Sequence, residues 1–305
     1  IYCAGDGNTH TICNCEKNIN DVLSEDGKMS PKHMLTSTIG DEIKLFNSNS
    51  KVIGISLKDR GAILSAGHSA NAAYWMDKHG EWITSSYYMQ NLPEWLIKYQ
   101  SKKSVSQYLK GKWSYKNMFN HSLDSILIND GGGGIKITPM GNTILKDLAI
   151  EIIKNEKLGK DEDIDMLTIS FSSTDYIGHK YGPHAEEIKD TYIKLDKDIA
   201  EILKHIDKDN SIIFLTADHG VVSEPHELIE RKIPSGYFDK EKLIKSLNEY
   251  LNNKFIDQNM VTPKSWIKNF SNLQLFLDHD LITHSSFSLK DIQEACAAFI
   301  LNFEG

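Results

Sequence analysis

Two short segments each place an acid and a histidine where both side chains could bind one cation. In "SSTDYIGHKYG", Asp175 and His179 are four residues apart, so a single helical turn brings them to one face. In "FLTADHG", Asp218 and His219 are adjacent and follow the apolar run 212–215. Burying such an acid–imidazole pair without a partner would cost several kcal/mol. Because carboxylate and neutral imidazole suit zinc, these four residues are candidate metal ligands.

A third segment, "ISLKDRG", supplies two cations. Lys58 and Arg60 are two residues apart, so their side chains point the same way if strand geometry persists beyond Leu57. Arginine offers phosphate a two-pronged donor, and lysine offers a mobile point charge. The alternative is a surface charge run. If Lys58 and Arg60 lie next to the candidate metal ligands, they would bind an anion that the metal ions also hold.

Three apolar segments read as strands, and each ends at one of these sets: 51–57 before the two cations, 163–173 before Asp175, and 210–217 before Asp218. In open α/β sheets, functional groups gather at the carboxyl ends of the strands. If the last two strands are neighbours, the four candidate ligands converge. Such a cluster would suit two metal ions about 3.5–4 Å apart, which clamp a phosphoryl oxygen and activate an oxygen nucleophile.

Helical periodicity supports this arrangement. Segment 184–207 repeats apolar residues in steps of three and four, which marks one face of an amphipathic helix. Residues 166–215 therefore read as a strand–helix–strand unit with parallel, neighbouring strands. A second helix is predicted over 139–159, with Gly159 as its stop signal. The pattern indicates the α/β fold class.

The remaining segments are less informative. Residues 61–129 are rich in aromatics and read as an inserted cap or lid beside a cleft, or as the core of a subdomain. The glycine cluster 130–134 lacks the Gly-Lys-Ser/Thr ending of a phosphate loop, so we expect a flexible loop. Among the other histidines, His226 and His284 are reserve candidates for the site.

Bulk properties exclude some classes. The net charge is −8 over 305 residues, which disfavours nucleic-acid binding, and there is no apolar run of the roughly 18 residues that a membrane span needs. No signal peptide is visible at the start of the sequence. The cysteine spacing does not match a zinc ribbon and predicts free or locally paired thiols at Cys3, Cys13, Cys15 and Cys296.

Several quoted stretches resemble a known family. "SFSSTDYIGHKYGP", "DTYIKLDKDIAEIL" and "FLTADHG" look like the alkaline phosphatase superfamily, in its type I phosphodiesterase / nucleotide pyrophosphatase-like branch. "GKMSP", "ISLKDRGAIL", "AAYWMD", "WITSSYYM" and "LPEWL" resemble the PafA-type alkaline phosphatases, which are secreted or periplasmic zinc phosphomonoesterases. The likeness spans essentially the whole chain. It implies one catalytic domain over 1–305, a three-layer sandwich around a mostly parallel sheet, with 61–129 as the cap.

The resemblance also implies roles for individual residues. Asp175 and His179 would bind one Zn²⁺ ion, and Asp218 and His219 the other, with other divalent metals possible. Lys58 and Arg60 would contact the transferred phosphoryl group of a small phosphate ester. In the family this Lys-x-Arg pair goes with phosphate monoesters, so we expect a phosphatase that forms a phosphoenzyme.

Other family features have no match in the sequence. These are an N-terminal strand with an aspartate ligand, a threonine nucleophile, an asparagine near the phosphate, and a final zinc-binding histidine. We therefore expect a fragment lacking both ends, inactive alone, with weak zinc binding and a destabilised sheet. One alternative is a phosphodiesterase or nucleotide pyrophosphatase, against which Lys58 and Arg60 argue. Another is a non-catalytic metal-binding remnant, which the missing nucleophile favours and the intact ligand pairs oppose.

Overall fold

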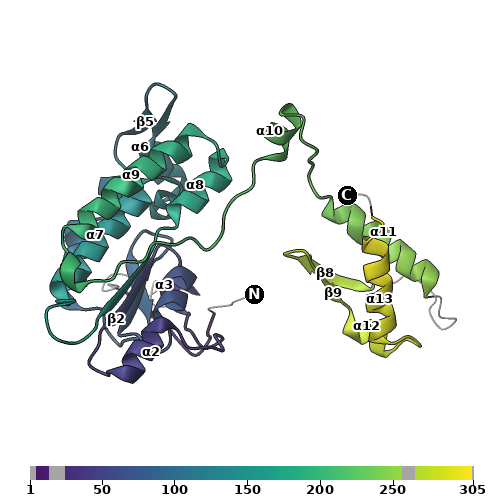
Figure 1. Cartoon of the computed structure of the whole chain (residues 1–305), viewed down its shortest axis with the longest axis horizontal. Helices are drawn as coiled ribbons and strands as arrows, with labels where there is room; N and C mark the ends of the chain where they lie inside the picture. Colours follow the sequence, from purple (N-terminus) through teal and green to yellow (C-terminus); the bar gives the residue numbers. More distant parts are fainter. Residues whose placement is uncertain (1–4, 14–24, 256–264, 304–305) are drawn as a thin grey trace. The chain divides into compact units, whose positions relative to one another are not determined.

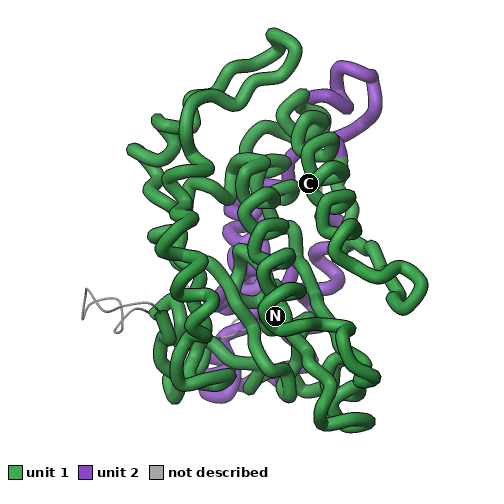
Figure 2. Tube along the Cα trace, turned by 90° about the vertical axis from the view of Figure 1, so that its left-hand side faces the viewer, with its two compact units in different colours: residues 1–222 green, residues 223–305 purple. Residues whose placement is uncertain are grey.

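The computed structural model describes residues 5–13, 25–255 and 265–303. It consists of two compact units, residues 1–222 and 223–305, which Figure 2 distinguishes by colour. No helix within the described ranges is long and apolar enough to cross a membrane.

Unit 1 is built on a five-stranded sheet. Strand β2 runs parallel to β3 on one side and to the edge strand β7 on the other, while β4 and β1 continue the sheet antiparallel beyond β3. In sheet order, the strands are β1 (Thr11–Ile12), β4 (Trp82–Ser85), β3 (Ala72–Met76), β2 (Val52–Ser56) and β7 (Met166–Ser170).

Helices cover both faces of this sheet (Figure 1). One hydrophobic core joins strand residues such as Ile53 and Tyr74 to Leu145 of α7, and a smaller core packs Trp75 on the opposite face against Ile63 of α3. The expected α/β layering is therefore confirmed. The α-helices of unit 1 are α2 (Ile39–Phe46), α3 (Asp59–Ala66), α4 (Glu94–Lys102), α5 (Val105–Tyr108), α6 (Leu123–Asp130), α7 (Met140–Asn155), α8 (Ser173–Tyr181) and α9 (Glu186–Leu203).

The predicted strands at 51–57 and 163–173 and the helices at 139–159 and 184–207 are confirmed as β2, β7, α7 and α9. The third predicted strand, 210–217, is wrong. After the short 3-10 helix η3 (Lys208–Asn210), the segment forms no strand, and the side chain of Phe214 is 86% exposed. An extended segment becomes a strand only when its backbone groups form hydrogen bonds with a neighbouring strand. None of the described strands pairs with residues 210–217.

The glycine cluster is also not the flexible loop that composition suggested. It forms the 3-10 helix η2 (Gly132–Ile137), in which Gly132 and Gly134 are buried. A Cβ atom at Gly132 would lie 1.9 Å from the backbone oxygen of His79, so glycine permits a close approach of two backbones. The segment is ordered by packing against the 77–80 turn.

Gly132→Ala is therefore expected to lower the free energy of unfolding by about 2 kcal/mol, because a short 3-10 segment must shift away from His79. Urea denaturation measures the change. Gly7→Ala is the control, since a Cβ at Gly7 meets nothing within 4 Å. Equal stability of the two variants would contradict the packing explanation.

The predicted cap range 61–129 includes β3 and β4, which belong to the sheet, together with α4, α5 and most of α3 and α6. It also contains the hairpin of β5 (Lys112–Tyr115) and β6 (Phe119–Ser122). Several of its aromatics are buried in the cores, Trp75 and Trp113 among them. That the range acts as a cap over a cleft stays a prediction.

Unit 2 has its own core around Leu247 and Trp266. Its elements are α10 (Pro225–Glu230), α11 (Lys240–Lys254), β8 (Ile267–Ser271), β9 (Gln274–Leu277), α12 (His279–Thr283) and α13 (Leu289–Ile300). One further element of unit 1 is the short 3-10 helix η1 (Glu25–Gly27). That the units form one catalytic domain over 1–305 stays a prediction.

The cysteines differ in state. Cys13 is disulfide-bonded, and Cys296 of α13 is a buried free thiol whose pKa is raised by burial. Cys3 and Cys15 lie outside the described residues.

Candidate active site

The site lies where β2 and β7 end side by side. Ser56 and Ser170, the last residues of these parallel strands, are paired in register. The chain then enters a helix at both places: Lys58 is the N-cap of α3, and α8 begins at Ser173. Because the strands are parallel neighbours, Lys58 and the first turn of α8 come to the same edge of the sheet.

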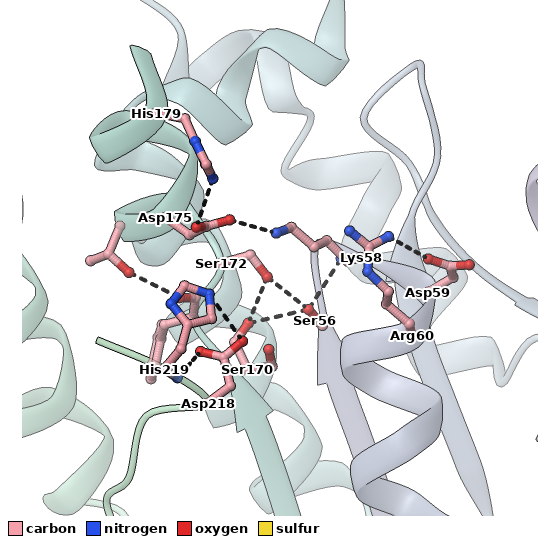
Figure 3. Close-up of polar contacts among 12 residues, drawn as sticks. Ser56, Lys58, Asp59, Arg60, Ser170, Ser172, Asp175, His179, Asp218 and His219 are labelled. Atoms are coloured by element: carbon pink, nitrogen blue, oxygen red, sulfur yellow. Dashed lines mark hydrogen bonds and ion pairs between the residues drawn. The ribbon is translucent and has the colours of Figure 1, made fainter. Parts of the chain in front are cut away.

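Lys58 contacts the first predicted ligand directly. Its Nζ lies 3.0 Å from Oδ2 of Asp175 and 4.3 Å from the ring centre of Tyr176. Both charged side chains are partly shielded, with 16% of Lys58 and 32% of Asp175 exposed. Figure 3 shows Lys58 reaching across from β2 to α8. The ion pair joins one candidate phosphate-binding residue to one candidate metal ligand.

Asp175 and His179 are brought together by α8, as their spacing predicted. His179 Nε2 lies 3.3 Å from Asp175 Oδ1, one turn along the helix. Burial alone would raise the pKa of Asp175, but the hydrogen bond and charge of Lys58, with smaller contributions from His179 and His219, bring that pKa below its ordinary value. Asp175 is thus held as a carboxylate, which is the form that ligates a metal.

Asp218 and His219 lie on the exposed segment that follows η3. His219 Nε2 is 3.7 Å from Asp218 Oδ2, and His219 Nδ1 is 2.8 Å from the carbonyl oxygen of Gly220. The Gly220 carbonyl and then the Asp218 charge raise the pKa of His219, with a smaller contribution from Asp175. His219 is therefore within electrostatic reach of Asp175, and Figure 3 shows both pairs around the strand end at Ser170.

Serine residues that the sequence reasoning missed tie the two strand ends together. Ser56 Oγ lies 3.1 Å from Ser172 Oγ and 3.2 Å from the carbonyl oxygen of Ser170, and it accepts a hydrogen bond from the Lys58 backbone N–H. Ser56 is fully buried. The sequence signal for this contact was a serine at the end of each strand. The hydrogen bonds between these serines fix the spacing of the turns that carry Lys58 and Asp175.

The side chains of Lys58 and Arg60 were expected to point the same way if the strand continued past Leu57. The strand does not continue that far. The chain becomes helical at Asp59, so Arg60 lies in the first turn of α3. Its Nη1 is 3.7 Å from Asp59 Oδ1, and its side chain is 57% exposed. Its contact with a phosphoryl group stays a prediction.

The four candidate ligands are of the types that zinc binds, but each pair has fewer ligands than a catalytic zinc ion needs. Each pair offers a carboxylate and an imidazole, whereas a catalytic zinc ion takes three protein ligands and a water. Within residues 5–13, 25–255 and 265–303, no three His, Cys, Asp or Glu side chains come close enough to hold an ion. The described residues therefore supply two candidate ligand pairs rather than a complete centre.

The two reserve histidines have local partners within unit 2. His226 Nε2 lies 3.4 Å from Glu230 on α10, and His284 Nδ1 lies 2.7 Å from the carbonyl oxygen of Asp280. A ligand role for either histidine stays a prediction.

Comparison with known proteins places the chain in a family. A profile of the type I phosphodiesterase / nucleotide pyrophosphatase family matches residues 17–295, so the chain belongs to that family. The crystal structure of wild-type alkaline phosphatase PafA superimposes with a TM-score of 0.85 at 30% identity, over 100% of this chain and 61% of that one. The resemblance to PafA-type alkaline phosphatases is confirmed, and with it the hydrolase superfamily.

Two curated relatives give the same picture. The chain is 39% identical to a "Calcium-transporting ATPase" of Myroides odoratus, over 92% of this chain and 56% of that protein. It is 30% identical to alkaline phosphatase PafA of Elizabethkingia meningoseptica, over 96% of this chain and 57% of the relative. The chain thus spans less than three fifths of these relatives' length.

Proposed function

We propose that the protein is a metal-dependent phosphate monoester hydrolase of the alkaline phosphatase type. Asp175 with His179 and Asp218 with His219 would bind two zinc ions or other divalent metals. Lys58 and Arg60 would bind the transferred phosphoryl group. Bound zinc would supply a Lewis acid that polarises a phosphoryl oxygen.

One observation carries the proposal: Lys58 at the end of β2 lies 3.0 Å from Asp175 at the start of α8. A cation that suits phosphate and a carboxylate that suits a metal thus meet at the carboxyl edge of a parallel sheet. A monoester carries more negative charge than a diester, so an added lysine and arginine favour it.

We also propose a periplasmic or secreted location and a small phosphate-ester substrate. The disulfide at Cys13 supports this location, because disulfides persist mainly in oxidising compartments.

The competing function is a phosphodiesterase or nucleotide pyrophosphatase, which the name of the matching family favours. The test compares kcat/KM for an aryl phosphate and an aryl phosphodiester, using the protein expressed from its complete natural gene. ATP is a third substrate, because one relative is named an ATPase. We expect the monoester to be preferred at least about 100-fold. A preference for the diester would refute the monoesterase.

Residues 1–305 alone are expected to show little turnover, because the described residues bring together only ligand pairs. The measurement is zinc-dependent hydrolysis of an aryl phosphate by the purified 305-residue chain. Turnover equal to that of the complete gene product would show that the site is already whole in this chain. A non-catalytic metal-binding remnant would instead bind zinc in both forms and hydrolyse nothing.

A further inference from the structure

The β5–β6 hairpin reaches the junction of the two helices that follow β7. Trp113 of β5 and His121 of β6 are paired across the hairpin, and both rings contact Tyr181, the last residue of α8. The ring centres of His121 and Tyr181 are 5.0 Å apart, and those of Trp113 and Tyr181 are 5.9 Å apart. Figure 1 shows β5 at the same end of unit 1 as α8 and α9.

Two hydrogen bonds fasten the hairpin to α9. His121 Nε2 lies 2.8 Å from Glu187 Oε1, and Trp113 Nε1 donates to Asp190 Oδ2 at 2.7 Å. Asp190 is buried and also binds Lys194. A buried carboxylate held by two donors is a firm attachment, because losing either donor would leave a buried acceptor with a missing hydrogen bond. The hairpin is therefore anchored on α9 while its rings press on α8.

This contact falls close to the candidate site. Tyr181 is two residues after His179, on the same helix as Asp175, and α8 stops at Gly182, whose φ of +94° suits glycine. The side chain of His179 itself is 80% exposed, with Asp175 as its partner. Its position therefore depends on how firmly the last turn of α8 is held, and the rings on Tyr181 hold that turn.

We propose that His121 is a positioning residue for the site: through its ring contact with Tyr181 it fixes the last turn of α8, and so fixes His179 relative to Asp175. The inference rests on the proposed function, since it assigns His121 to the support of a metal ligand. His121 touches neither Asp175 nor His179 in any contact of the structure. A partner that hydrogen-bonds a metal ligand typically changes metal affinity by about 10- to 100-fold when removed, and His121 acts one residue further out, so we expect the low end of that range.

The test uses three variants of the complete gene product. His121→Phe keeps a ring against Tyr181, His121→Gln keeps a donor for Glu187, and His121→Ala keeps neither. His10→Ala is the control, because His10 is exposed and precedes β1, at the opposite edge of the sheet from β7. The first readout is the ring resonance of His179 in histidine-labelled, metal-free protein. The second is zinc affinity by competition with a chelating dye.

We expect His121→Ala to shift the His179 resonance and to weaken zinc binding about tenfold, with Phe closest to wild type and Gln intermediate. His10→Ala should change neither readout. An unchanged His179 resonance in folded His121→Ala would overturn the inference. The inference would also fail if His121→Gln behaved like wild type while His121→Phe shifted the resonance and weakened zinc binding. If the wild type binds no zinc, the proposed function fails, and the His179 resonance still decides the role of His121.

Discussion

Replacing both Lys58 and Arg60 by alanine is expected to lower kcat/KM for an aryl phosphate by about 10³-fold or more in the complete gene product. Charged donors aimed at the phosphoryl oxygens typically contribute about 10²- to 10³-fold each. Because a diester has one fewer negative charge, its kcat/KM should fall much less. The two substrates measured side by side with the double variant give the result.

The control for this experiment is another lysine–aspartate pair of unit 1. Lys103 Nζ lies 2.9 Å from Asp147 Oδ2 of α7, so Lys103→Ala removes a lysine–aspartate ion pair that has a more exposed lysine and includes no candidate site residue. Lys103→Ala should leave both activities near wild type. Equal losses on monoester and diester in the double variant would mean that Lys58 and Arg60 act structurally and do not recognise the monoester.

Gly54→Ala is expected to have the largest effect on stability, about 3 kcal/mol in the free energy of unfolding. Gly54 lies in the middle of β2, where a Cβ would approach the backbone oxygen of Ala62 to 2.3 Å and the Cβ of Ala66 to 2.7 Å. Unlike a surface segment, β2 is bonded on both sides by β3 and β7, so it cannot move away. The added methyl group must push α3 off the sheet. Urea unfolding followed by circular dichroism measures the loss.

Gly178→Ala is the matched glycine control. Gly178 lies inside α8, and a Cβ there would meet Ile188 at 3.6 Å, which is ordinary contact. Alanine has the better helix propensity by about 1 kcal/mol, so this variant should be as stable as wild type or more so. If Gly54→Ala were as stable as Gly178→Ala, α3 would not be packed against β2 as closely as described.

The sequence predicted correctly those elements whose periodicity and burial agree. β2 and β7 carry mostly apolar runs and pair side by side in the sheet, whereas α7 and α9 carry clean helical repeats and pack against each other. The D-x3-H spacing likewise placed Asp175 and His179 on one helical face. Local pattern was sufficient here because the interactions it predicts are local or involve a single sheet.

Prediction failed where the outcome depends on a neighbour that the pattern does not specify. The apolar run 212–215 looks like β2, but none of the described strands pairs with it. The glycines at 132 and 133 looked flexible, yet they permit a backbone contact with a turn some fifty residues earlier. The same applies to His121, whose partners Tyr181 and Glu187 are distant in sequence.

The most direct test of the central claim is zinc reconstitution of the complete gene product. Metal is removed with a chelator, zinc is added back in steps, and aryl phosphate hydrolysis is measured for wild type, Asp175→Asn and Lys58→Ala/Arg60→Ala. We predict that activity disappears with the metal and returns with zinc in the wild type. Asp175→Asn should bind zinc weakly, whereas the double variant should bind zinc and hydrolyse little monoester. Full activity of the metal-free wild type, or of Asp175→Asn, would contradict the account.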